Sequence, residues 1–233
     1  MADHIQVRGL RKIYTRGANT IVVLDGVDLD VDGGEFVALM GPSGSGKTTL
    51  LNIIAGIDRS DAGTVTVDGA DVTAMSDSQQ TAWRTHNLGY IFQFYNLLPV
   101  VTAWENVELP LLVLSLSKQQ RREHVAAALE AVGASDRMKH YPRQMSGGQE
   151  QRVAIARAIV TDARIIVADE PTGNLDAAAE KEIMELLRRL CDELGKTMIL
   201  VTHDATAAAY ADRVVHLEKG HIVPQEEVQS HVR

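Results

Sequence analysis

The sequence contains a single cysteine, Cys191, among 233 residues. One cysteine can form neither an internal disulfide nor a metal site built from several thiolates, so both are excluded. This composition is compatible with a reducing compartment. A chain of this length with 45% hydrophobic residues has enough apolar material for the core of one α/β domain.

Long hydrophobic runs are also missing. The longest apolar stretch lies at about residues 109–116 and is interrupted by Pro110 and Ser115. A membrane-spanning helix needs about 18 apolar residues or more. The segment Met1–Arg8 is polar and lacks the apolar core of a signal peptide. If the protein serves transport, we expect another chain to cross the membrane.

Positive charge is not in excess. The 23 Lys and Arg residues face 31 Asp and Glu residues, which gives a net charge of −8. Nucleic-acid binding requires a basic surface. The basic pairs at 121–122 and 188–189 lie in helix-like stretches rich in Glu, which indicates solvated helix faces. The sequence therefore predicts no nucleic-acid partner.

Strand-like and helix-like patterns alternate along the chain. Apolar β-branched runs and period-two alternation predict strands, and apolar residues at helical spacing predict helices. The strands are expected at 21–24, 27–31, 36–40, 64–67, 165–168, 198–201 and 214–217, and the helices at 48–55 and 177–194. Helical spacing also dominates from about 94 to 159. This order predicts an α/β fold with a mostly parallel core sheet, an antiparallel N-terminal part and a helical insertion.

A glycine-rich segment stands between the strand at 36–40 and the helix at 48–55. It matches G-x-x-x-x-G-K-[ST] in the strand–loop–helix context of a phosphate-binding loop, which disfavours the alternative of a tight turn without a ligand. Backbone N–H groups and a helix N-terminus surround the phosphates, Lys47 reaches the β- and γ-phosphates, and the Thr48 hydroxyl ligates Mg²⁺. The expected phosphate-loop and neighbouring contacts are Gly41, Pro42, Ser43, Gly44, Ser45, Gly46, Lys47, Thr48 and Thr49.

Two carboxylates, Asp169 and Glu170, follow the apolar strand at 165–168. Successive side chains on a strand point in different directions, so the two acids can take different tasks. Asp169 is expected on the metal side and Glu170 as the general base that polarises the attacking water. A solvated strand end is the alternative, and the nearby phosphate loop makes it the weaker one.

The segment Met145-Ser146-Gly147-Gly148-Gln149 resembles the signature motif of ABC ATPases. By itself it could be a Ser-Gly-Gly helix cap. Beside a phosphate loop, its N–H groups at a helix start provide a second anion site. The chain departs from the family pattern at Met145, where Leu is usual, and at Glu150. The resemblance implies that the nucleotide is ATP, bound with Mg²⁺.

Further family elements follow in the family's order. Gln93 looks like the Q-loop glutamine, a metal and catalytic contact, and Asp176 looks like the D-loop aspartate that reaches across a dimer. His203 looks like the switch histidine near the γ-phosphate. Tyr14 is similar to the aromatic residue that stacks on adenine, for which packing within the fold is the alternative. The implied metal contacts are therefore Thr48, Gln93 and Asp169.

The resemblance extends over about Ile5–Val223. Residues 92–99, 105–110 and 168–176 look like the ATPases of lipoprotein-releasing, macrolide-efflux and antimicrobial-peptide exporters. It implies one ABC ATPase domain over 1–233 of P-loop NTPase type. The implied parts are a catalytic core with the β-subdomain at 1–93 and 160–223, a helical subdomain at 94–159 and a polar tail at 224–233.

The family mechanism implies that two such subunits close head-to-tail. ATP then lies between the phosphate loop of one and the signature segment of the other, and closure and hydrolysis drive a separate membrane permease. The resemblance implies a homodimer in the ATP-bound state at the cytoplasmic, inner face of the membrane. The subfamily implies that the motion passes to an extracytoplasmic domain of the permease.

Three other functions are compatible with parts of the sequence. A soluble ABC ATPase of DNA repair, chromosome organisation or the ribosome usually has a long coiled-coil insertion or two ATPase domains, whereas only residues 49–144 separate the two motifs here. A regulatory nucleotide sensor would not need Glu170 and His203. A nucleotide or metabolite kinase could share the phosphate loop but would not need the signature segment 145–149.

Overall fold

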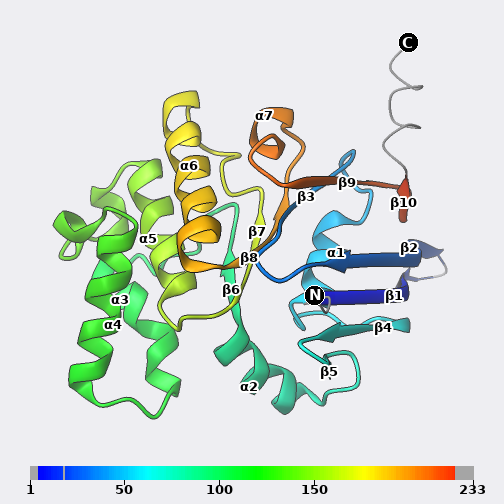
Figure 1. Cartoon of the computed structure of the whole chain (residues 1–233), viewed down its shortest axis with the longest axis horizontal. Coiled ribbons are helices and arrows are strands. Elements are labelled where there is room, and N and C mark those ends of the chain that lie inside the picture. The colour runs from blue at the N-terminus through cyan, green and yellow to red at the C-terminus, as the bar shows by residue number, and fades with distance from the viewer. Residues whose placement is uncertain (1–4, 18, 224–233) are drawn as a thin grey trace. The chain divides into compact units, whose positions relative to one another are not determined.

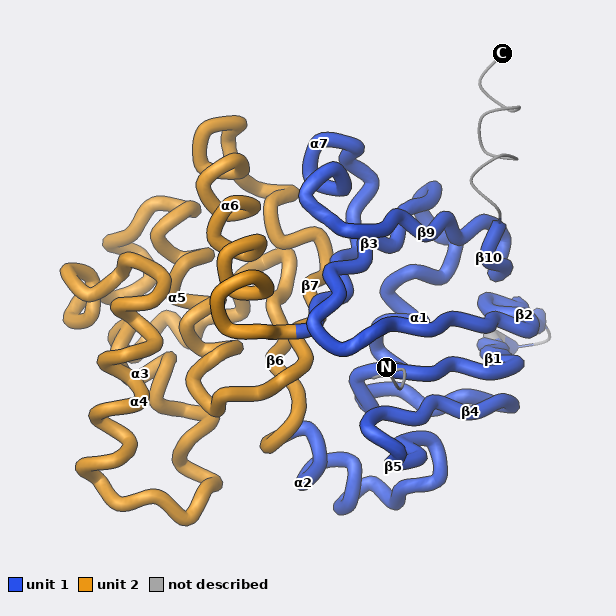
Figure 2. The backbone as a smooth tube through the Cα atoms, viewed as in Figure 1, with its two compact units in different colours: residues 1–84, 197–233 blue, residues 85–196 orange. Residues whose placement is uncertain are grey.

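The computed structural model describes residues 5–17 and 19–223, and the polar tail expected at 224–233 lies outside them. The chain divides into two compact units, residues 1–84 with 197–233 and residues 85–196 (Figure 2). These units group the elements differently from the expected helical subdomain at 94–159, which stays a prediction.

The first unit contains an antiparallel sheet, as the N-terminal strand patterns predicted (Figure 1). Its strand order is β2-β1-β4-β5. Strand alternation buries one side of this sheet, including Ile5, Val7, Val65 and Val67. The two strands expected at 21–24 and 27–31 form one continuous strand. The bounds are β1 (Ile5–Arg16), β2 (Asn19–Val31), β4 (Ala62–Val67) and β5 (Ala70–Asp71).

A second set of strands in the first unit surrounds β3 (Phe36–Met40). β3 pairs in parallel with β8 (Thr197–Val201) on one side and with β9 (Arg213–Glu218) on the other. β10 (His221–Val223) extends the set antiparallel to β9. Because parallel strands end at the same edge of a sheet, the segments after Met40 and Val201 leave from one edge. The helices of this part are α1 (Lys47–Ile54) and α7 (Ala205–Ala208).

The second unit combines a parallel strand pair with helices. β6 (Leu88–Ile91) pairs in parallel with β7 (Ile165–Asp169). α3, α4 and α5 pack against one another (Figure 1), and this part of the chain is helical as predicted. The helical elements are α3 (Ala103–Glu108), η1 (Leu109–Val113), α4 (Lys118–Ala131), η2 (Ser135–Arg137), η3 (Pro142–Gln144), α5 (Gly147–Ile159) and α6 (Ala177–Leu194).

The helix α2 (Asp77–Asn87) has no counterpart in the sequence expectations. Its residues are mostly polar, and Gln80 is its one buried residue. Ala82 and Trp83 are its only apolar residues, so the sequence shows no apolar stripe at helical spacing. Its position depends on contacts outside the helix, such as the bond from the Gln80 amide to the Val72 carbonyl at 3.0 Å.

Local side-chain bonds define where the helices of the second unit begin. Thr102, Ser117 and Ser146 form capping boxes with the residue three positions later, at the starts of α3, α4 and α5. Asp176 caps α6. Such caps satisfy N–H groups that have no partner inside the helix and contribute about 1 kcal/mol each.

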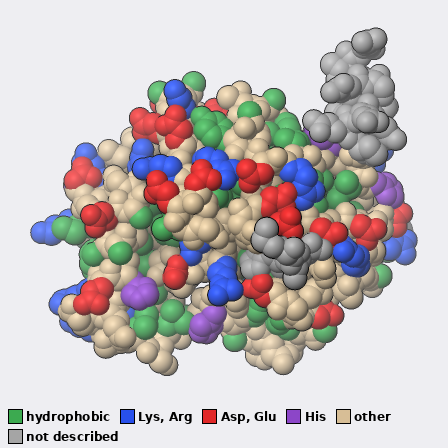
Figure 3. All heavy atoms as spheres, viewed as in Figure 1, with side chains coloured by type: hydrophobic (Ala, Val, Ile, Leu, Met, Phe, Trp, Pro, Cys, Tyr) green, Lys and Arg blue, Asp and Glu red, His purple; other side chains and the backbone are tan. Residues whose placement is uncertain are grey.

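On the face drawn in Figure 3, acidic and basic side chains are interspersed rather than gathered by sign. None of the helices in residues 5–17 and 19–223 combines the length and the apolarity that crossing a bilayer requires.

A buried asparagine fixes the loop before α3. Asn106 is fully buried, and its amide oxygen accepts from the Leu98 N–H at 2.7 Å. Its amide nitrogen donates to the carbonyls of Leu98, Val101 and Thr102 at 3.1, 3.3 and 3.0 Å. A buried group with all its hydrogen bonds made is costly to remove, because the backbone groups left behind stay unpaired.

We therefore expect Asn106→Ala to lower the free energy of unfolding by about 2–4 kcal/mol. Chemical denaturation measures this change. Gln119→Ala is the control, because the Gln119 amide bonds only an exposed carboxylate of Glu123. Equal stability of the two variants would contradict the anchoring role of Asn106.

Candidate functional site

The phosphate loop follows β3 and requires glycine at its two ends. A Cβ at Gly41 would lie 2.1 Å from the carbonyl oxygen of Leu217, and one at Gly46 would lie 2.8 Å from the carbonyl oxygen of Val23. Both glycines also have positive φ, 149° and 105°. Larger residues would push the loop away from the strands that support it, so the glycine spacing in the sequence has a steric cause.

Polar groups inside this loop fit a bound phosphate. The buried Lys47 ammonium donates to the carbonyls of Gly41 and Pro42 at 2.8 and 2.9 Å, which holds a positive charge within the loop. The Ser45 hydroxyl is buried and has no hydrogen-bond partner among the described residues. α1 begins at Lys47 without a side-chain cap, so its first N–H groups are left for an anion.

Tyr14 and His203 belong to the same unit as the phosphate loop. Tyr14 lies on β1 and is 42% exposed. His203 is exposed after β8. The Thr202 N–H bonds the Leu39 carbonyl at 3.2 Å, which ties the end of β8 to β3, the strand that leads into the phosphate loop.

Gln93 and Glu170 come together at the carboxyl ends of β6 and β7. The Gln93 amide nitrogen lies 3.5 Å from a Glu170 carboxylate oxygen. Asn174 donates to the Gln93 carbonyl at 2.9 Å. Gly173 leaves room for this pair, because a Cβ there would lie 3.3 Å from the Gln93 amide nitrogen and 3.5 Å from the Glu170 carboxylate. The structure thus joins two residues that the sequence separates widely.

The metal set expected from the sequence divides between the units. Thr48 belongs to the first unit, whereas Gln93 and Asp169 belong to the second. Their hydroxyl, amide and carboxylate oxygens are of the hard type that Mg²⁺ prefers. Among the described residues, no cluster of three or more His, Cys, Asp or Glu side chains could hold a metal ion by itself. The magnesium contacts remain a prediction.

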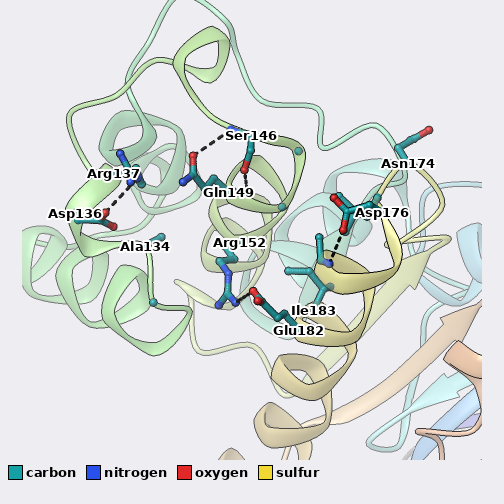
Figure 4. A pocket seen from close by; sticks show the side chains of 15 residues that line it. Ala134, Asp136, Arg137, Ser146, Gln149, Arg152, Asn174, Asp176, Glu182 and Ile183 are labelled. Atoms are coloured by element: carbon teal, nitrogen blue, oxygen red, sulfur yellow. Dashed lines mark hydrogen bonds and ion pairs between the residues drawn. The ribbon is translucent and has the colours of Figure 1, made fainter.

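The signature segment and the D-loop line one cavity of about 530 Å³ in the second unit (Figure 4). Ser146 caps α5 by accepting from the Gln149 N–H at 3.4 Å, and the Gln149 side chain accepts from the Ser146 N–H at 3.0 Å. Asp176 caps α6 by accepting from the N–H groups of Ala178 and Ala179. Both helix starts therefore open into the same cavity, as Figure 4 shows.

Several polar residues of this cavity had no sequence signal. Arg152 donates to Glu182 at 2.8 Å and to the Val132 carbonyl at 2.8 Å, which joins α5 to α6 (Figure 4). Asp136 and Arg137 also line the cavity. Charged residues on helices usually face solvent. Only the position of these residues in the fold therefore distinguishes them from ordinary surface charges.

The loop after Gln93 is held in an uncommon conformation by the signature helix α5. Tyr95 and Asn96 have φ values of 54° and 52°, a region that residues other than glycine seldom adopt. Arg157 on α5 donates to both of their carbonyls, at 2.7 and 2.5 Å. Burial lowers the pKa of Arg157. An arginine remains charged nonetheless, so these carbonyls keep a cationic donor. No sequence pattern indicates this contact, because Arg157 and the two carbonyls are about 60 residues apart.

Glu150, one of the departures from the family pattern, lies in the first turn of α5. Burial raises the pKa of its carboxyl group. Burial and the charge of Glu150 raise the pKa of Tyr95, whose hydroxyl lies 2.9 Å from the position of a Cβ at Gly147. The departure thus places an acid on the signature helix, close enough for its charge to affect Tyr95 in the Q-loop segment.

Comparison with known proteins matches this geometry to one family. The sequence profile of the ABC transporter family matches residues 24–173. The chain is 46% identical to the ABC transporter ATP-binding protein YknY of Bacillus subtilis, over 94% of this chain and 95% of that protein. It is 44% identical to the lipoprotein-releasing system ATP-binding protein LolD of Porphyromonas gingivalis, over 93% and 97% of the two chains.

A longer relative and a solved structure give the same result. The macrolide export ATP-binding/permease protein MacB of Rhodopirellula baltica is 45% identical over 93% of this chain, which spans 32% of that protein. The dimeric post-hydrolysis structure of the ATP-binding cassette MJ0796 with ADP and Pi superposes with a TM-score of 0.87, at 40% identity over 94% of this chain and 97% of that one. The chain therefore belongs to the ABC transporter family, among its ATP-binding proteins.

Proposed function

We propose that this chain is the ATP-hydrolysing motor subunit of a transporter, which closes as a dimer on Mg-ATP and drives a separate membrane permease. The observation that carries the hydrolytic part is the 3.5 Å contact between the Gln93 amide and the Glu170 carboxylate at the carboxyl ends of β6 and β7. Ligands of open α/β sheets bind at this edge.

Glu170 is the general base in this proposal. Its carboxylate accepts a proton from the water that attacks the γ-phosphorus, and the bond from that phosphorus to the β–γ bridging oxygen breaks to leave ADP and phosphate. Gln93 orients the carboxylate and the water. Glu170 has a φ of 45°, a costly backbone conformation of the kind that often occurs at functional sites.

Lys47 and the N-terminus of α1 hold the β- and γ-phosphates and offset their charge. Thr48, Gln93 and Asp169 would hold Mg²⁺, which neutralises charge on the phosphate oxygens when bound. His203 contacts the γ-phosphate region, and Tyr14 stacks on the adenine.

The signature cavity supports a dimer. Exposed Ser146 and the glycine N–H groups that begin α5 form a second anion site that opens into about 530 Å³ of space. The γ-phosphate of an ATP held by a partner subunit fits such a site, and Asp176 lies beside it. The related cassette MJ0796 has been solved as a dimer with ADP and Pi, so the arrangement is attainable for this fold.

A permease partner follows from the relatives and from the surface. MacB joins an ATP-binding part and a permease in one protein by its name, and this chain spans 32% of it. Phe94, Val100 and Val113 are 69%, 79% and 74% exposed in the second unit, which offers apolar surface to a partner. We place the subunit at the cytoplasmic, inner face of the membrane and assign it to export or mechanical transmission. The soluble, non-transport alternative has no observation that favours it.

Glu170→Gln tests the base. Because the amide cannot accept the proton, we expect ATP to bind normally while phosphate release falls by about 100-fold or more. Light scattering should then show a dimer only with Mg-ATP. Glu193→Gln, an exposed change on α6, is the control. Near-normal ATP turnover by Glu170→Gln would mean that another residue is the general base.

Lys47→Ala tests the phosphate loop. Loss of the one ammonium inside the loop should weaken ATP binding by about 10-fold or more, measured by calorimetry. The control is Lys181→Ala, because the Lys181 side chain is 71% exposed on α6. Unchanged ATP affinity in Lys47→Ala would remove the phosphate-loop assignment.

A further inference from the structure

Two charged side chains hold the ring of Tyr14 in place. The Lys12 ammonium lies 4.8 Å from the centroid of the Tyr14 ring, although Lys12 is only 8% exposed. The same ammonium donates to a carboxylate oxygen of Asp58 at 2.7 Å and to the Arg59 carbonyl at 2.6 Å. The other carboxylate oxygen of Asp58 accepts from the Tyr14 hydroxyl at 2.5 Å. Lysine, tyrosine and aspartate thus form a closed triangle of contacts.

This triangle is anchored to the helix that begins at the phosphate loop. The N–H groups of Ile57 and Asp58 donate to the Asn52 carbonyl in α1 at 2.8 and 3.1 Å. Two more bonds join the following loop to β1. The Asp61 N–H donates to the Arg11 carbonyl at 2.9 Å, and the Asp61 carboxylate accepts from the Ile13 N–H at 2.6 Å. Tyr14 is therefore fixed relative to α1.

The protonation states suit this arrangement. Partial burial opposes ionisation of Asp58, but hydrogen bonds from Lys12 and Tyr14 outweigh it and lower the pKa of the carboxyl group. Burial and the hydrogen bond to Asp58 raise the pKa of the Tyr14 hydroxyl. At neutral pH the hydroxyl therefore remains a donor and Asp58 remains a charged acceptor.

We propose that Lys12 and Asp58 are positioning residues of the adenine site and act through Tyr14. This inference rests on the stacking role proposed for Tyr14. Lys12 covers one ring face, so a purine base can stack only on the opposite face. Asp58 holds the hydroxyl, so the ring keeps one orientation before the nucleotide arrives. A preorganised ring loses less conformational entropy when a nucleotide binds. The affinity for ligands that carry a base therefore rises, whereas the affinity for phosphates alone does not.

A purely structural ion pair is the competing explanation, because many Lys–Asp pairs contribute little to function. The two explanations differ in what they affect. A positioning role changes binding only of ligands that carry a base, and only while the ring is present. A structural role changes the fold, and with it the binding of phosphates as well.

The experiment measures the affinities of ATP and of inorganic tripolyphosphate by calorimetry for Lys12→Met, Tyr14→Ala and the double variant. We expect Lys12→Met to lower the affinity for ATP about 5-fold and Tyr14→Ala to lower it about 10-fold. Tripolyphosphate affinity should stay unchanged in both. In the Tyr14→Ala background, Lys12→Met should cause no further loss. Lys12→Arg, which keeps a cation, should retain most of the ATP affinity.

The control is Arg11→Met on the same strand, whose guanidinium lies beside the exposed carboxylate of Asp25 at 3.3 Å. Asp58→Asn provides a second route if Lys12→Met does not fold, and the same selective loss of ATP affinity is expected. Two results would overturn the proposal even if Tyr14→Ala still weakens ATP binding. One is an unchanged ATP affinity in Lys12→Met, and the other is a loss of tripolyphosphate affinity equal to the loss of ATP affinity. If Tyr14→Ala leaves ATP binding intact, the stacking role itself fails and the proposal fails with it.

Discussion

An α-helix leaves its first backbone N–H groups without partners inside the helix, and the proposed function of this chain uses two such helix starts as phosphate sites. α1 begins after Gly46 with no side-chain cap, directly behind the buried Lys47 ammonium. α5 begins after Ser146, which caps it and lines an open cavity. In the proposed dimer, the N-terminus of α1 binds the triphosphate held by its own chain. The N-terminus of α5 binds the triphosphate held by the partner. In the proposed function, a second subunit is therefore needed to supply an anion for the remaining N–H groups at the start of α5.

Backbone strain occurs at the proposed general base and in the loop that follows Gln93. Glu170, Tyr95 and Asn96 all have positive φ without being glycine. Such conformations cost about 1–3 kcal/mol each and persist where neighbouring contacts hold them. Arg157 supplies those contacts for Tyr95 and Asn96 from the signature helix. The loop that follows Gln93 is therefore hydrogen-bonded to α5, the helix that begins at the signature segment. The proposed hydrolytic site and the proposed second anion site are thus connected through α5.

Buried ammonium groups organise the nucleotide side of the first unit in the same way. Lys47 bonds two carbonyls of the phosphate loop, and Lys12 bonds Asp58 and the Arg59 carbonyl. A buried cation is tolerated only when its donors are satisfied. Each lysine therefore fixes the loop around it, one at the proposed position of the phosphates and one at the proposed position of the base.

The sequence by itself determined the features that depend on neighbours along the chain. The glycine spacing of the phosphate loop, the serine and glutamine of the α5 capping box and the acids after β7 are local patterns, and the alternation of strands and helices predicted the α/β class. Only the tertiary structure decided that β3 lies between β8 and β9, that Arg157 bonds Tyr95 and that Lys12 meets Asp58. These partners are far apart in the chain, and their meeting depends on how strands pair and helices pack. The polar helix α2 was missed because polar contacts to other segments, such as the bond from Gln80 to the Val72 carbonyl, rather than an apolar stripe hold it.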